Sequence, residues 1–219
     1  SVFSFALILV CLMIARTDLP LKALLWLYIG ALSVMGFFYV PASTADLFRI
    51  RQMMELFSSM ELLPFFRTYA ADSSVPTARL LYWLVGKAHI PGLLPALACC
   101  ISYGCIFYIL ADSANRRKSS RTDIAVALFF ILSAGQFIFV VSNIRTMIAV
   151  ALVCFCAYRE TVVRKYSFWH LILYGFAVTI HTFAFVVLIL RLLIPVLNRA
   201  LPLWKRAATA ALVLVFLGG

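Results

Sequence analysis

Charged side chains are scarce in this chain of 219 residues. Only 12% of the positions carry Asp, Glu, Lys or Arg, and Asp and Glu together account for eight of them. A typical soluble domain has about 25% charged residues. In place of charge, 65% of the residues are hydrophobic and the mean hydropathy is +1.05. This composition argues against a soluble domain and predicts a polytopic membrane protein.

The sequence also lacks cysteines in polar loops and histidines in clusters. The six cysteines all lie in apolar stretches, so no disulfide framework is predicted, and we expect small buried hydrophobes in helix contacts. His89, His170 and His181 are far apart, and no Cys/His pair has the spacing of metal ligands in a loop. We therefore expect neither a metal site nor a cofactor.

Apolar stretches recur along the whole chain. A helix needs roughly 20 apolar residues, at about 1.5 Å each, to cross about 30 Å of hydrocarbon. We predict an all-α transmembrane bundle of about eight spans that forms a single domain over residues 1–219. The predicted spans are 2–15, 23–40, 90–111, 124–142, 144–158, 167–180, 182–197 and 207–219. The first and last stretches look cut and no basic leader region precedes the first, so we expect a fragment of a longer protein without a signal peptide.

The net charge of +11 has an uneven distribution. Basic residues gather in every second connection: Arg16 and Lys22; Arg116, Arg117, Lys118 and Arg121; Arg159, Arg164 and Lys165; Arg199, Lys205 and Arg206. The positive-inside rule makes these connections cytoplasmic, and all eight predicted spans alternate consistently with it. The charge thus reflects topology, with anionic membrane lipids as the expected contact and no nucleic-acid binding.

One long connection, residues 41–89, is predicted to face outward. Residues 46–60 have helical periodicity, with Ile50, Met53, Met54, Phe57 and Met60 on one face and mainly polar residues on the other. We expect this amphipathic helix to lie in the membrane interface, to begin after a cap at Ser43 or Thr44 and to end by Pro64. A second short helix is predicted from Pro76 to about Gly86.

Two ionisable residues fall at membrane depth in the predicted spans: Arg145, within SNIRTM, and His181, within TIHTF. Such a side chain costs a few kcal/mol, so it usually lines a cavity and marks a function. The helical arms 146–158 and 182–197 reach only about 20 to 24 Å, which draws both residues into the outer leaflet. Arg145 can instead reach outer headgroups or bond to carbonyls, and His181 can be a structural histidine.

An arginine at a helix start suits a phosphate group. Its guanidinium donates bidentate hydrogen bonds, and the helix terminus adds free N–H groups. Arg49 and Arg51 of the amphipathic helix either add positive charge or form a solvated face. Asp46 is either a partner of the helix dipole or an acid/base group. Arg191 is expected to extend its head group toward the cytoplasmic side.

Three segments resemble a known family. The segment SNIRTMIAVA around Arg145 is similar to the R-x-x-[LIM]-A pattern, and IHTFA around His181 to the later H-[ST]-x-[AL] pattern, of EpsG-like and Wzy-like polysaccharide polymerases. The stretch PASTADLFR resembles their outer-loop Asp, here Asp46, followed by aromatic and basic residues. The resemblance covers residues from about 35 to 197 and keeps the order of outer Asp, outer Arg and outer His. Family members are generally longer than this chain.

The resemblance implies a metal-independent glycosyltransferase of the bacterial cytoplasmic membrane. It would polymerise or transfer oligosaccharide repeat units carried on polyprenyl diphosphate, for exopolysaccharide, O-antigen or capsule, alongside other polysaccharide-assembly membrane proteins. Arg145, with Arg49 or Arg51, would bind the pyrophosphate, and His181 or Asp46 would be the catalytic base. The alternative is a transporter or flippase of a lipid-linked or anionic substrate, although the sequence lacks a convincing pair of broken helices.

Overall fold

The computed structural model describes residues 2–17, 19–43, 45–134, 137–165, 167–197 and 207, and these residues form helices and turns without strands. The elements are α1 (Val2–Arg16), α2 (Leu21–Phe37), α3 (Asp46–Ser58), α4 (Leu62–Phe65), the π-helix η1 (Phe66–Ala70), α5 (Pro76–Lys87), α6 (Leu93–Arg117), α7 (Arg121–Ala134), α8 (Phe137–Ser142), α9 (Ile144–Thr161), α10 (Phe168–Ile180) and α11 (Phe183–Leu197). The all-α prediction is confirmed. The predicted span 207–219 lies outside the described residues, except for Ala207.

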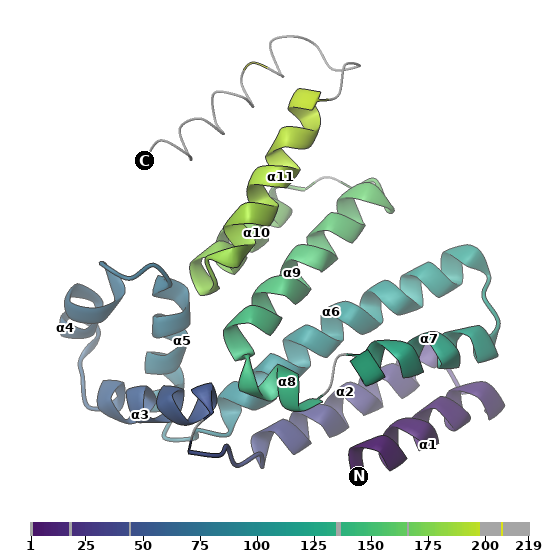
Figure 1. Ribbon diagram of the computed structural model, residues 1–219, viewed down its shortest axis with the longest axis horizontal. Helices are drawn as coiled ribbons and strands as arrows, with labels where there is room; N and C mark the ends of the chain where they lie inside the picture. Colours follow the sequence, from purple (N-terminus) through teal and green to yellow (C-terminus); the bar gives the residue numbers. More distant parts are fainter. Residues whose placement is uncertain are drawn as a thin grey trace.

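The long helices form a fan around α6 (Figure 1). On one side, α6 packs with α1, α2, α7 and α8 around one apolar core, and on the other it meets α9 at the edge of a second core shared with α3, α5 and α10. The short helices α3 to α5 lie where α2 ends and α6 begins, whereas α1, α6 and α9 end at the opposite side of the molecule (Figure 1). The loop 41–89 is therefore well separated from the basic ends of α1, α6 and α9, whereas Arg199, Lys205 and Arg206 lie outside the described residues.

Helix length supports only part of the predicted bundle. In the described part of the chain, α6 alone is both long and apolar enough to cross a membrane; the apolar helices Leu7–Arg16, Leu21–Phe37 and Phe168–Ile180 are shorter. Within the predicted span 124–142, α7 extends to Ala134 and α8 begins at Phe137, and residues 135 and 136 between them lie outside the described residues.

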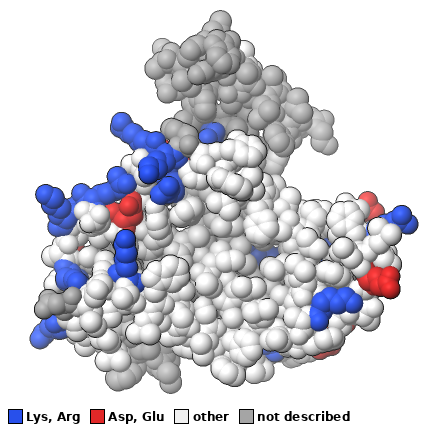
Figure 2. Space-filling model, turned by 180° about the vertical axis from the view of Figure 1, so that it is seen from behind, with Lys and Arg blue, Asp and Glu red and all other residues white. Residues whose placement is uncertain are grey.

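Large apolar side chains cover much of the surface. Trp169 is 71% exposed, Leu27 68% and Phe130 66%. On the face drawn in Figure 2, the charged residues gather toward two ends, and the broad zone between them is nearly free of charge. The cysteines are divided between the interior and this apolar surface. Cys99 and Cys156 are buried as expected, but Cys100 and Cys154 are exposed. Contiguous apolar surface of this extent marks contact with a membrane or another protein.

The outer loop folds onto itself. The apolar face of α3 is buried, and Gly86 of α5 lets it approach closely, because a Cβ at Gly86 would collide with the Met54 carbonyl. The Phe57 ring lies 5.0 Å from that of Phe65, and the Trp83 indole donates a hydrogen bond of 3.0 Å to the Met60 carbonyl. The amphipathic helix is confirmed, but its apolar face covers α5 instead of facing the interface.

Two details of this loop differ from the sequence predictions. Ala45 occupies the N-cap of α3 and no side chain caps the helix, so Ser43 is not its cap; Thr44 lies outside the described residues. The helix α4 and the π-helix go beyond the sequence prediction, which ends helical structure at Pro64 at the latest. A proline is tolerated in the first turn of a helix, where its missing N–H has no partner to lose. The helix α5 begins at Pro76 as predicted and ends at Lys87.

Candidate functional site

Arg145 and Asp46 meet where the start of α9 contacts the start of α3. Arg145 lies in the first turn of α9, Asp46 is the first residue of α3, and Nη2 of the arginine is 3.3 Å from Oδ2 of the aspartate. Their side chains are 36% and 42% exposed. A single, half-exposed ion pair of this kind contributes only about 0 to 1 kcal/mol to the free energy of unfolding. The pair is therefore easily opened by a ligand that offers the guanidinium a better anion.

His181 lies in the connection between α10 and α11, in extended backbone with φ −148° and ψ 122°. The N–H of Phe183 donates a hydrogen bond of 3.1 Å to Nδ1, which assigns the proton of the neutral ring to Nε2. Burial, and then the positive charge of Arg145, lower the pKa of His181 from 6.5. The ring is thus neutral at pH 7 and presents an N–H donor within electrostatic range of Arg145.

Tyr82 of α5 is a member of this site that the sequence analysis missed. Its side chain is 2% exposed, its hydroxyl has no hydrogen-bond partner among the described residues, and it interacts electrostatically with both Arg145 and Asp46. Burial is the main cause that raises its pKa well above 10.0, so the phenol stays neutral and can donate. Helical periodicity gave no signal here, because a tyrosine on a buried face looks like any core residue.

The connection between α5 and α10 holds the site in place. The hydroxyl of Thr77 donates a hydrogen bond of 2.7 Å to that of Thr179, two residues before His181. Thr179 in turn bonds to the carbonyls of Gly175 and Phe176, each at 3.0 Å. The end of α10 is thereby fixed against the helix that carries Tyr82.

The two other predicted arginines have different surroundings. Arg51 donates a hydrogen bond of 2.8 Å from Nη2 to the Tyr39 carbonyl and lines a cavity of about 220 Å³ with Glu55 and His89. It ties α3 to the end of α2, so a purely solvated face is wrong for this residue. Arg49 is exposed and lies one turn after Asp46, on the same side of the helix. Arg49 is therefore the better placed of the two to assist Arg145.

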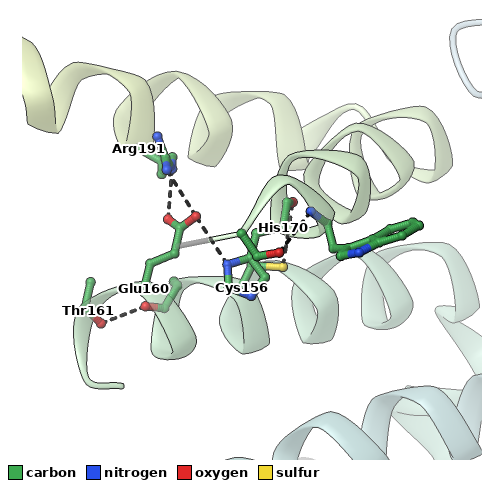
Figure 3. A network of polar contacts seen from close by, with 8 residues as sticks. Cys156, Glu160, Thr161, His170 and Arg191 are labelled. Carbon is green, nitrogen blue, oxygen red and sulfur yellow. Dashed lines mark hydrogen bonds and ion pairs between the residues drawn. The ribbon is translucent and has the colours of Figure 1, made fainter. Parts of the chain in front are cut away.

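A second polar cluster lies at the opposite end of α9 (Figure 3). The carboxylate of Glu160, which is 5% exposed, accepts two hydrogen bonds from Arg191, at 2.8 and 3.1 Å. Nδ1 of the buried His170 lies 3.6 Å from Oε1 of Glu160, and the Cys156 thiol contacts the His170 carbonyl at 3.9 Å. Arg191 binds the carboxylate of Glu160, near the end of α9 that leads into the basic connection 159–165, and its extension toward the cytoplasmic side stays a prediction.

Sequence spacing did not reveal this cluster, because Glu160 and Arg191 are 31 positions apart. The one signal was an acidic residue at the end of an apolar helix, in a chain with few acids. Across the described ranges, no three His, Cys, Asp or Glu side chains come together as metal ligands.

No protein-family model matches the sequence, and neither the curated proteins nor the solved structures contain a match to it.

Proposed function

We propose that the chain is part of a multi-pass protein of the bacterial cytoplasmic membrane, with α3 to α5 on the outer side. The exposed apolar zone between two charged ends supports this placement (Figure 2). So does the separation of the outer loop from the basic connections. Helices shorter than about 20 residues can still span a bilayer if the lipid thins or flanking residues complete the span.

Within that membrane, the protein polymerises or transfers oligosaccharide units from a polyprenyl diphosphate carrier. The observation that carries this proposal is the convergence of Asp46, Arg145 and His181 from three distant segments at the outer end. These are the residues through which the chain resembles EpsG-like and Wzy-like polymerases. Together they supply a cation, a carboxylate and a neutral donor.

The reaction forms a bond between an acceptor hydroxyl oxygen and the anomeric carbon, and it breaks the bond from that carbon to the diphosphate. Arg145 exchanges Asp46 for the diphosphate and stabilises the negative charge that develops on the leaving group. Asp46, released from the ion pair, accepts the proton of the acceptor hydroxyl. His181 is less suited to that task in this conformation, because its unprotonated nitrogen, Nδ1, is occupied by the Phe183 N–H. Its Nε2–H serves as a donor to the diphosphate or the sugar.

Turnover of a lipid-linked oligosaccharide tests the proposal. The protein is reconstituted in proteoliposomes with a polyprenyl-diphosphate-linked oligosaccharide, and mass spectrometry follows longer glycans and released polyprenyl diphosphate. Both products should accumulate without added metal and should be absent with Arg145→Ala. Movement of the intact substrate across the membrane without glycan growth would contradict the proposal and favour the flippase alternative.

A further inference from the structure

A groove runs between α2 and α6 on the side of the molecule where the basic connections lie. It consists of two adjoining hollows of about 230 and 340 Å³, which share Lys22, Tyr108 and Ala111 in their walls. The first hollow continues along the helices past Trp26 and Gly104. It is far from Arg145, because it adjoins the start of α2 and the second half of α6.

The part of the groove beside Gly104 is apolar and open. A Cβ at Gly104 would meet no atom within 4 Å. Leu25, Ile29 and Phe107 form buried walls, and the Trp26 indole, 67% exposed, stands at the rim. An open slot with these apolar walls suits a hydrocarbon chain that lies along the helices.

The mouth of the groove carries positive charge. Lys22 is exposed there, and the guanidinium carbon of Arg159 lies 5.8 Å from the centre of the Tyr108 ring, whose hydroxyl accepts a hydrogen bond from the arginine. The mouth also contains Asp112, but its charge is balanced by Arg116, whose Nε is 2.7 Å from the carboxylate. Lys22, which lines both hollows, and Arg159, which lies beside them in contact with Tyr108, therefore give the mouth a net positive charge next to the apolar part of the groove.

We propose that this groove binds one anionic glycerophospholipid of the cytoplasmic leaflet. One acyl chain lies between α2 and α6 beside Gly104, and the phosphate contacts Lys22, with Arg159 adding positive charge at the mouth. Basic pockets between membrane helices on the cytoplasmic side are suited to anionic head groups. The inference rests on the membrane placement proposed above and is independent of the glycosyl-transfer reaction.

Fluorescence quenching at Trp26 tests the site. A variant that keeps Trp26 and has phenylalanine at the other tryptophans is placed in nanodiscs with a small fraction of brominated phosphatidylglycerol or brominated phosphatidylcholine in a neutral host lipid. We expect an apparent affinity about fivefold higher for the anionic lipid, the effect of one basic contact near a membrane surface. Gly104→Leu, which fills the slot, and Lys22→Gln, which removes the charge, should each abolish this preference.

Two matched controls separate the groove from general lipid contact. Gly30→Leu also adds a side chain where a Cβ meets no atom within 4 Å, and Lys165→Gln removes an exposed charge from a basic connection. Both should keep the preference. Equal quenching by the two lipids, or a preference that survives Gly104→Leu, would overturn the proposal.

Native mass spectrometry of the wild-type chain, ejected from nanodiscs containing both lipids, provides a second measurement that needs no tryptophan replacement. A retained phosphatidylglycerol that Gly104→Leu removes supports the site, and a chain that retains neither lipid contradicts it. Because neither experiment measures glycan growth, loss of the lipid preference with turnover intact would reject only this inference.

Discussion

Arg145 is held by a contact that is too weak to explain its position by stability alone. Its single interaction with Asp46 spans 3.3 Å and is partly exposed, whereas the buried Tyr82 hydroxyl and the neutral His181 ring lie nearby. This setting supports the proposal that Arg145 binds an incoming anion. The properties of this residue and its neighbours can be tested separately.

Replacing Arg145 should remove catalysis without preventing membrane insertion. Loss of one preorganised donor to a developing charge costs on the order of 100-fold to 1000-fold in rate, so Arg145→Ala should give no detectable polymer. Arg145→Lys keeps the charge but loses the planar fork, and it should also be severely impaired. Polymer length on gels, normalised to inserted protein, is the measurement, with Arg67→Lys, an exposed arginine of the loop 41–89, as the control. Normal chains from Arg145→Ala would reject the leaving-group role and point to Arg49 or Arg51.

The pKa of His181 should depend on Arg145. Arg145→Gln removes a positive charge and should raise this pKa toward 6.5, while burial keeps it below that value. Because the folded pKa lies below the unfolded one, the unfolded state takes up the proton first as the pH falls. The contribution of His181 to stability is therefore complete above pH 6.5 and is lost as the pH falls through the lowered value.

NMR titration of the imidazole signals, assigned with His181→Gln, measures this shift. Lys87→Gln, at the end of α5 in the loop 41–89, should leave the titration unchanged. An unaltered His181 titration in Arg145→Gln would show that the two residues are not electrostatically coupled. Retained polymer synthesis in His181→Gln would agree with a donor role, because the amide can replace the Nε2–H.

At the scale of elements, α9 joins the two polar clusters. Arg145 lies at its start and Glu160 near its end, about 22 Å apart at the helical rise of about 1.5 Å per residue. Near the end of α9, Glu160 accepts hydrogen bonds from Arg191 of α11 and lies close to His170 of α10. The three helices are thus tied together by one buried carboxylate, which fixes the end of α10 opposite to His181.

Removal of one member of this buried pair should destabilise the bundle strongly. Arg191→Met leaves the Glu160 charge without its bidentate partner, and breaking such a pair costs about 3 to 5 kcal/mol. The double replacement Glu160→Gln with Arg191→Met should reduce the stability of the bundle less than Arg191→Met alone. Thermal unfolding in detergent measures the effect, and Arg116→Met, at an exposed pair, should shift the midpoint far less. Additive losses in the double variant would contradict a coupled buried pair.

At the scale of the whole molecule, charge and exposure agree on one orientation. The loop 41–89 and the basic ends of α1, α6 and α9 lie on opposite sides, with an apolar surface between them (Figures 1 and 2). Such a distribution would be costly for a protein surrounded by water. In the bilayer placement that we propose, the Arg145 cluster lies on the outer side and the α2/α6 groove on the cytoplasmic side.

Cysteine accessibility should report this orientation. In a cysteine-free background, Ser73→Cys should react with an impermeant maleimide added from outside, because the residue follows the π-helix of the outer loop. Arg117→Cys, at the end of α6, should react only after the membrane is permeabilised. Labelling of Ser73→Cys solely from the cytoplasmic side would overturn the topology.

Composition and hydrophobic periodicity were sufficient to predict the helical class, most helix positions, and Asp46, Arg145 and His181 as residues of interest. These are local signals: an apolar run, an amphipathic pattern or an isolated charge can be recognised within a few turns of sequence. Only the tertiary structure decided that Asp46 bonds to Arg145, that Arg51 bonds to Tyr39, and that Glu160 binds Arg191. Those pairings join residues from different elements, and their partners depend on how the helices pack. Sequence spacing carries no record of that packing.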